Sequence, residues 1–402
     1  MDPPLHLAGP PQLVCAHGRS DHARTRRDHL QRAPQWRAHG CHGRAAFGDR
    51  IVQYLRRQRV AGLEPDHGVA AGVSGRQGVL HRHVLLQRKS AGAVKLLIAV
   101  LGATATGKSA LGIALAERLG GEILNCDSTA VYRGFDIGTD KVPMAERRGI
   151  PHHLIDIADP TDEYTAAQFA RDATATIRDI HARGLVPILV GGTGFYYRAL
   201  TRGLFPGPAA DAPLRARLEA IAATRGVERL HRLVARVDPE SAVRIMPRDL
   251  MRLVRALEVY FLTGRPLTAH FEETVSLLDP DVQVIPIGLR MPAAWLSKRL
   301  TERVDSQFDA GLLDEIRGLL AAGVPPDARP FGGLVYRQAM EHLRGLRDEA
   351  ATRALIAQEN RRYARRQLIW FRKEPNLVWF DGPGTHAEVQ DSVVEMLSCG
   401  TC

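Results

Sequence analysis

The stretch GATATGKS, residues 102–109, decides the fold of this chain because it matches the phosphate-loop pattern G-x-x-x-x-G-K-[S/T] at all four fixed positions. The apolar run LLIAVL at 96–101 is typical of a buried parallel strand, and the amphipathic segment 110–119 is typical of a helix. The unpaired first amides of such a helix and the glycine-rich turn form an anion site. We therefore expect a polyphosphate to be bound by Gly102, Ala103, Thr104, Ala105, Thr106, Gly107, Lys108 and Ser109.

Two side chains of this loop have separate predicted roles. Lys108 places a positive charge on the terminal phosphates, and the Ser109 hydroxyl is a candidate ligand for a phosphate-bound Mg²⁺. The loop alone leaves open whether the phosphate belongs to a nucleotide.

Length and composition are those of an ordinary globular protein of about two or three domains, with 402 residues, 45% apolar and 24% charged. The formal net charge is +10, but residues 1–94 hold 15 Lys and Arg against 6 Asp and Glu, so nearly all of the excess lies there. That segment also holds nine of the sixteen histidines and lacks sustained periodicity, which predicts a poorly ordered basic extension. Three alternatives for this segment are an RNA-binding arm, a metal site formed by its histidines, and an over-extended gene model whose true start lies near Lys95.

Targeting and redox features are sparse. No apolar run approaches the roughly 18 residues that span a bilayer, and the N-terminus lacks a compact apolar secretory signal. The five cysteines are scattered, and the terminal pair Cys399 and Cys402 is interpreted as incidental. These features predict a cytoplasmic protein.

The order of elements predicts an α/β fold. Strands are expected at 95–101, 122–126, 153–157, 186–190, 282–289 and 377–380, with helices between most of them. This alternation favours a parallel sheet covered by helices on both faces, built from residues 95–208 and 281–402. Residues 209–280 form a helical, Arg-rich insertion in which arginines 244, 248, 252 and 255 are expected on one helix face.

Asp127 follows the predicted strand 122–126, at the carboxyl edge of the sheet and beside the phosphate loop. A carboxylate there serves as a Mg²⁺ partner, a general base or a helix cap. The strand 186–190 runs into Gly191, Gly192, Thr193 and Gly194 instead of an acidic residue, so the acid of a nucleotide hydrolase is missing. This absence lowers the expectation of ATP hydrolysis.

Basic and aromatic residues alternate along 361–373, on a predicted helix. Cations suit phosphates and flat rings suit unstacked bases, so this segment predicts RNA binding. The alternative is a solvated helix face whose aromatic side chains belong to the core.

Six ordered blocks together resemble the tRNA dimethylallyltransferase family: GATATGKS, DSTAVYRGFDIGTDK, PHHLIDIADP, GGTGFYYRALTRGL, RALEVYFLTGRPL and ARRQLIWFR. The resemblance implies a P-loop NTPase-like fold whose loop holds the pyrophosphate of dimethylallyl pyrophosphate, with Mg²⁺. It implies transfer of the dimethylallyl group to N6 of the adenosine 3′ to the anticodon. By resemblance Asp127 accepts the amine proton, Thr193 contacts the adenosine, Arg303 stabilises the leaving pyrophosphate, and Lys108 and Ser109 hold it.

The resemblance also implies that the insertion clamps the anticodon stem-loop of a tRNA. The implied tRNA contacts are Asp127, Ser128, Thr129, Ala130, Thr193, Arg215, Met251, Arg252, Leu253, Val254, Arg255, Gly332, Gly333, Leu334, Val335, Tyr336, Arg337, Arg365, Arg366, Gln367, Leu368, Ile369, Trp370, Phe371 and Arg372. The chain departs from the family pattern at Ala130, Val335, Asn360 and Ile369. A monomer is expected, and a phosphate-loop kinase and a non-catalytic RNA-binding protein are the competing interpretations.

Overall fold

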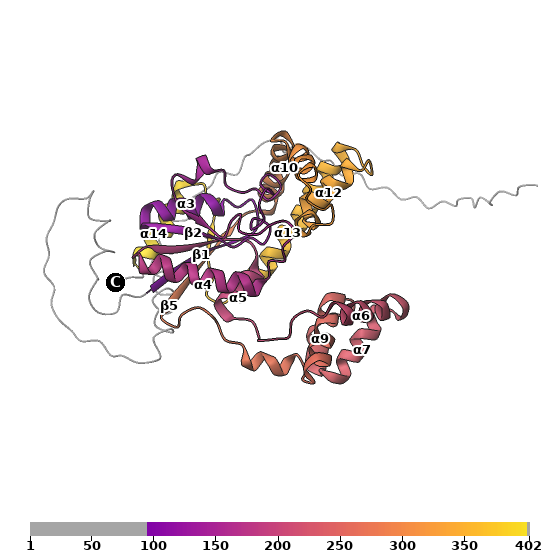
Figure 1. Cartoon of the computed structure of the whole chain (residues 1–402). Helices are drawn as coiled ribbons and strands as arrows, with labels where there is room; N and C mark the ends of the chain where they lie inside the picture. The colour runs from indigo at the N-terminus through magenta and orange to yellow at the C-terminus, as the bar shows by residue number, and fades with distance from the viewer. Residues whose placement is uncertain (1–94, 400–402) are drawn as a thin grey trace, which may run out of the picture. The chain divides into compact units, whose positions relative to one another are not determined.

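A computed structural model describes residues 95–399, whose central element is a six-stranded, entirely parallel sheet (Figure 1). The strand order is β3-β2-β4-β1-β5-β6. The strands are β1 (Lys95–Gly102), β2 (Gly121–Asn125), β3 (His152–His153), β4 (Val186–Gly191), β5 (Val282–Arg290) and β6 (Val378–Asp381). The predicted α/β sheet is confirmed.

Alternation along the strands separates the two faces of the sheet. Leu97, Ala99 and Leu101 of β1 belong to a core shared with α4 (Ala166–Ala182) and α5 (Gly194–Arg202). On the opposite face α3 (Lys108–Leu119) lies so close that a Cβ on Gly112 would stand 2.6 Å from Val190 Cγ2. Figure 1 shows α3 with α14 (Ala387–Cys399) on one side of the sheet and α4 with α5 on the other. Helices therefore cover both faces.

Polar side chains fix the starts of several helices. Thr165 Oγ1 accepts a hydrogen bond from Gln168 N, and Gln168 Oε1 accepts one from Thr165 N, which completes a capping box before α4. Asp249 and Asp348 cap α9 (Leu250–Thr263) and α13 (Glu349–Phe371) with one side-chain hydrogen bond each, without the reciprocal bond of a capping box. Each of these helices therefore begins with a paired backbone N–H.

One expectation about the sheet was wrong. The strand predicted at 153–157 ends at His153 because Leu154 and Asp156 have φ of 60° and 56°, a left-handed conformation that interrupts the extended chain. The strand β2 does not adjoin β1, since β4 pairs with both. Gly191 at the end of β4 therefore lies between the phosphate loop and Asp127.

Helices from the second half of the chain pack over the segment that follows β2. Val131 and Phe135 share a core with residues of these helices, including Val304, Ile316 and Tyr336. The helices are α10 (Ala293–Asp309), α11 (Leu312–Ala321), α12 (Leu334–Leu343) and α13, joined by the 3₁₀ turn Arg329–Gly332; a further 3₁₀ turn, Met144–Arg147, precedes β3. This packing brings distant side chains to one edge of the sheet.

The residues of the predicted insertion form four helices around a hydrophobic core of their own, which includes Leu218, Leu230 and Leu257. The helices are α6 (Ala212–Arg225), α7 (Val227–Val237), α8 (Pro239–Arg244) and α9, followed by the 3₁₀ turn Thr268–Glu273. The predicted single arginine face is wrong because Arg244 ends α8 and Arg248 lies in the turn before α9. The limits 209–280 for a separate domain stay a prediction.

A buried carboxylate links two of these helices. Glu258 on α9 is fully buried and accepts hydrogen bonds from Asp211 N, from Arg215 at 2.7 and 2.9 Å, and from Arg255 at 2.6 Å. Burial raises its pKa, but the bonds from Arg215 and Arg255 outweigh burial and lower the pKa to about 2. Glu258 is therefore charged in the folded protein and neutralised by both arginines.

We expect Glu258→Gln to destabilise the insertion by roughly 3 kcal/mol because it leaves two arginines facing a neutral group. The contribution of the carboxylate is present above its unfolded pKa of 4.5 and is lost as the pH falls towards 2. Thermal unfolding and limited proteolysis at pH 7 measure the effect. Glu219→Gln, on the exposed surface of α6, is the matched control. Equal stability of the two variants would contradict a structural role for Glu258.

Within residues 95–399 no helix combines the length and apolar composition needed to cross a membrane. The predicted extension 1–94 and the terminal cysteines Cys399 and Cys402 lie outside the residues whose side chains are described.

Candidate active site

A cavity of about 850 Å³ opens at the carboxyl edge of β1, β2 and β4. The phosphate loop forms one wall, and the segment after β2 forms another. Helices α10, α12 and α13 contribute Arg303, Tyr336 and Tyr363. The fold thus unites residues that are more than 250 positions apart in the sequence, such as Lys108 and Tyr363.

The phosphate loop has the backbone that the sequence predicts. Gly102 and Gly107 adopt φ of 138° and 83°, which only glycine takes up without strain. Thr106 Oγ1 and Lys108 Nζ donate to Ala103 O at 2.9 and 2.6 Å. The loop is therefore closed on itself, with Lys108 and Ser109 lining the cavity.

The amine of Lys108 lies in a partly buried, cationic environment. Burial, followed by repulsion from Arg303, lowers its pKa from 10.5 to about 8, and nearby carboxylates oppose that change. A bound anion would favour the charged form of this amine.

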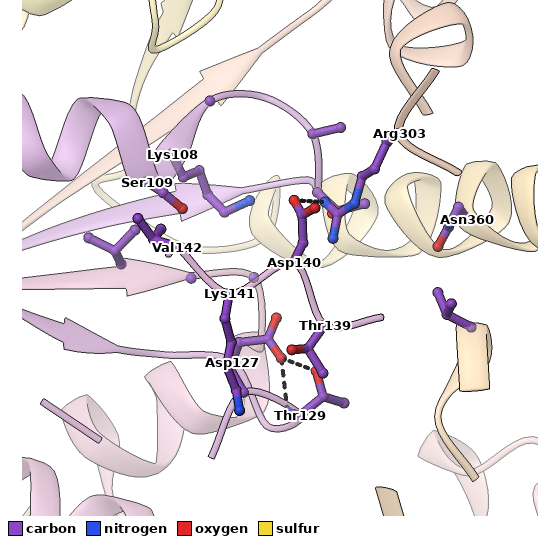
Figure 2. A pocket seen from close by; sticks show the side chains of 18 of the residues that line it. Lys108, Ser109, Asp127, Thr129, Thr139, Asp140, Lys141, Val142, Arg303 and Asn360 are labelled. Atoms are coloured by element: carbon purple, nitrogen blue, oxygen red, sulfur yellow. Dashed lines mark hydrogen bonds and ion pairs between the residues drawn. The ribbon is translucent and has the colours of Figure 1, made fainter. Parts of the chain in front are cut away.

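Asp127 is held in a fixed position by its own turn. Its Oδ1 accepts hydrogen bonds from Thr129 N at 2.9 Å and Thr129 Oγ1 at 2.6 Å, as the dashed lines in Figure 2 show. Asn125 exchanges hydrogen bonds with the backbone of the same residue. Neither contact uses Oδ2, so one carboxylate oxygen remains for a proton from a ligand in the cavity.

Thr193 joins the end of β4 to the turn after β2. Its Oγ1 accepts a hydrogen bond from Ser128 N at 3.1 Å, and its backbone N donates to Cys126 O. Gly191 permits this approach, since a Cβ there would stand 2.1 Å from Cys126 O. Thr193 is thus placed beside Asp127.

Arg303 reaches the phosphate loop from α10. Its Nη1 donates to Thr104 Oγ1 at 2.6 Å and lies 3.1 Å from Asp140 Oδ2. Figure 2 shows the Asp140 carboxylate between the Lys108 amine and the Arg303 guanidinium. The two predicted cations of the pyrophosphate site therefore face one cavity, and they share it with a carboxylate.

Tyr336, predicted as a tRNA contact, is instead buried and holds the loop that carries Asp140, together with Glu315, which sequence reasoning missed. Tyr336 Oη accepts from Gly138 N at 3.0 Å and donates to Glu315 at 2.5 Å, while Glu315 also accepts from the backbone of Asp136 and Ile137. Burial raises the Tyr336 pKa, so the hydroxyl keeps its proton. No local spacing relates these residues, because they come from three separate elements.

Gln367, predicted as a tRNA contact, bridges the two halves of the site instead. Its Oε1 accepts from Thr104 N and its Nε2 donates to Gly192 O, each at 2.9 Å, and its side chain is buried. Because both ends of the amide are used, Gln367 positions the phosphate loop against the end of β4.

Several other predicted tRNA contacts also need correction. Leu253, Val254 and Phe371 are buried in hydrophobic cores, so their side chains pack inside the protein. Arg215 and Arg255 are committed to Glu258. The buried side chains of Leu253, Val254 and Phe371 therefore do not reach an RNA, whereas Arg215 and Arg255 are partly exposed and their tRNA contacts stay a prediction.

Other predicted contacts do reach solvent. Met251 is 84% exposed, and Arg252 beside it is exposed as well. Arg365, Arg366 and Ile369 form the open face of α13, and the exposed Arg372 follows its last residue. Leu368 and Trp370 are half-buried, with Arg198 lying 4.2 Å above the Trp370 ring. Gly332 and Arg337 are exposed near α12, where Gly333 and Leu334 line the cavity with Ser128 and Thr129.

Three of the four departures from the family pattern lie inside the cavity. Ala130, Val335 and Asn360 are buried and line it, whereas Ile369 lies on the exposed face of α13. These differences therefore affect the shape of the cavity more than its rim.

Within the described residues, no group of three or more His, Cys, Asp or Glu side chains is arranged to hold a metal ion. The exposed hydroxyl of Ser109 still fits Mg²⁺, which commonly takes few protein ligands and several oxygens from a bound phosphate and water.

Comparisons with known proteins show the family of this chain. Residues 130–374 match the family model described as IPP transferase. The chain belongs to the IPP transferase family. A tRNA dimethylallyltransferase of Solibacter usitatus is 48% identical over 305 residues, covering 75% of this chain and 98% of that protein.

Two solved structures extend the IPP transferase likeness to the fold. A full-length tRNA isopentenylpyrophosphate transferase of Bacillus halodurans aligns with a TM-score of 0.56 and 36% identity, covering 77% of this chain and 98% of the other. A eukaryotic dimethylallyltransferase described as acting on tRNA aligns with a TM-score of 0.61 and 28% identity, covering 76% and 77%. The resemblance stated from the sequence blocks is confirmed.

Proposed function

We propose that this protein transfers a dimethylallyl group from dimethylallyl pyrophosphate to N6 of the adenosine 3′ to the anticodon of a tRNA. The observation that carries the proposal is a single cavity lined by the phosphate loop, Arg303 and Asp127. Cations for a leaving pyrophosphate and a carboxylate for an amine proton are what this transfer requires. Because tRNA is found in the cytoplasm, this proposed substrate supports the predicted cytoplasmic location of the protein.

In the proposed reaction a bond forms between N6 and the terminal CH₂ carbon of the dimethylallyl group, and the bond from that carbon to the pyrophosphate oxygen breaks. The N6 proton passes to Asp127 Oδ2, and the electron pair of the broken bond leaves with the pyrophosphate. Lys108, Arg303 and the loop amides bind that charge. Thr193, fixed beside Asp127, orients the adenosine.

Mg²⁺ fits the same proposal through Ser109, together with the oxygens of the substrate. When bound it neutralises part of the pyrophosphate charge. The protein's own cations act on the same leaving group, so their contribution is measurable separately.

The adenosine must leave the anticodon-loop stack to enter the cavity, which costs a few kcal/mol. Contacts to the RNA backbone offset that cost, and the exposed arginines of α13 with Arg252 of the insertion supply the charge. A small-molecule kinase does not need such surfaces. They favour tRNA over a small acceptor.

The decisive experiment incubates the full chain with unmodified tRNA, Mg²⁺ and either dimethylallyl pyrophosphate or ATP. We expect a mass gain of one dimethylallyl group on the target adenosine with the first donor and no phosphorylated product with the second. A tRNA carrying guanosine at that position is the control for the acceptor, and excess EDTA tests the metal. Phosphoryl transfer from ATP would favour the kinase, and tRNA binding without product would favour the non-catalytic interpretation.

A further inference from the structure

The cavity holds an acidic side chain where the proposed substrate brings its negative charge. Asp140 Oδ2 lies 3.1 Å from Arg303 Nη1, and both residues line the cavity with Lys108. Figure 2 shows the carboxylate directed between the two cations rather than towards Asp127. A diphosphate held by Lys108 and Arg303 would meet a like charge at this place.

Asp140 is not on a freely moving segment. Its neighbour Lys141 is buried and binds Asp136 at 2.6 Å and Asp156 at 2.5 Å, and Gln307 donates to Ile137 O at 3.1 Å. The backbone is therefore fixed on both sides, while the Asp140 side chain is half-exposed. The carboxylate can turn away only by rotation of its own side chain.

The backbone of Asp140 favours this residue type. Its φ of 59° is left-handed, a conformation that Asp and Asn tolerate better than other residues with a Cβ. Asn at this position preserves both the shape and the backbone, so the charge can be removed with little other change.

The charge of Asp140 acts on both cations. Its contribution favours the protonated form of Lys108, against burial and repulsion from Arg303. In the free protein Asp140 thus neutralises part of the site, and a diphosphate that binds both cations meets this carboxylate as a competing anion.

We propose that Asp140 is an internal counter-ion that competes with the diphosphate for Arg303 and Lys108, an inference that rests on the proposed function. Asp140 thereby sets the affinity of the site for the dimethylallyl donor. A ligand that binds only the state with a free Arg303 has its affinity reduced by the fraction of molecules in which Arg303 is already paired. Asp140 is in this sense a specificity-determining residue for the charged end of the donor.

Isothermal titration of the full chain with inorganic pyrophosphate tests the proposal, with Mg²⁺ and with EDTA. We expect Asp140→Asn to bind pyrophosphate roughly threefold to tenfold more tightly than the parent in both conditions. The KM for dimethylallyl pyrophosphate should fall by a similar factor, and pyrophosphate should become a stronger product inhibitor. If Asp140 served folding alone, Asp140→Asn would not increase the affinity for pyrophosphate or for dimethylallyl pyrophosphate.

Asp309→Asn is the matched control, because Asp309 is an exposed carboxylate paired with Arg353 outside the cavity. It should leave pyrophosphate binding unchanged. Equal affinity of the parent and Asp140→Asn would overturn the counter-ion proposal alone. Weaker binding of Asp140→Asn in Mg²⁺ would also overturn it, by placing the carboxylate on the metal–diphosphate complex. No binding of pyrophosphate to the parent would contradict the proposed function itself.

Discussion

Asp127→Asn should lower the turnover of tRNA prenylation by about 10²- to 10⁴-fold, the usual contribution of a general base. The amide retains an oxygen that accepts the two hydrogen bonds from Thr129, so the turn after β2 keeps its shape. What is lost is the group that takes the N6 proton. We therefore expect the binding of pyrophosphate and of tRNA to stay near the parental values.

Single-turnover measurements with bound tRNA isolate this effect from substrate binding. Asp159→Asn removes an exposed carboxylate outside the cavity that pairs with Arg133, and it should behave as the parent. A parental rate in Asp127→Asn would show that another group, or water, takes the proton. A loss of tRNA binding without a change in the single-turnover rate would assign Asp127 to recognition instead.

Arg303→Gln should lower kcat/KM for dimethylallyl pyrophosphate by about 10²- to 10³-fold, as expected when a donor to a developing anion is removed. The guanidinium is only 19% exposed and holds Thr104 of the phosphate loop, so it acts on charge in a partly desolvated place. Glutamine keeps a donor but no charge. Most of the loss should appear in kcat, because negative charge on the pyrophosphate oxygens grows as the bond breaks.

Arg303→Lys separates charge from geometry. Lysine restores the charge but offers no planar fork, so we expect recovery of part of the lost activity. Arg317→Gln, an exposed arginine of α11 paired with Asp314, controls for net charge. If Arg303→Gln changes KM alone, the residue binds substrate and transition state equally and does not assist the departure of pyrophosphate.

Lys108, Arg303 and Asp127 differ in how well the local sequence predicts their roles. The phosphate loop and Lys108 are encoded within eight consecutive residues, because the strand, turn and helix that they need are themselves local. Asp127 follows a short apolar strand, a position that places it at the ligand-binding edge of a parallel sheet. Arg303 has no such signal, and its role was inferred only through the resemblance to a family.

The errors of the sequence interpretation have physical causes. Periodicity describes one element at a time, and it predicted a strand at 153–157 that is longer than the observed β3. It carries no signal that Leu154 and Asp156 adopt left-handed conformations. The resemblance to a family implied tRNA contacts at Arg215, Arg255 and Gln367. Arg215 and Arg255 neutralise the buried Glu258, and Gln367 satisfies two backbone groups.

Local patterns were sufficient for the α/β class, the phosphate loop, the missing hydrolase acid and the helical character of the insertion, since each depends on neighbouring residues. Long-range packing was needed for the rest. It places β4 between β2 and β1, joins Gln367 to Thr104 across 263 positions, and brings Asp140 to Arg303. Such contacts arise when separate elements are packed together, and no spacing along the chain encodes them.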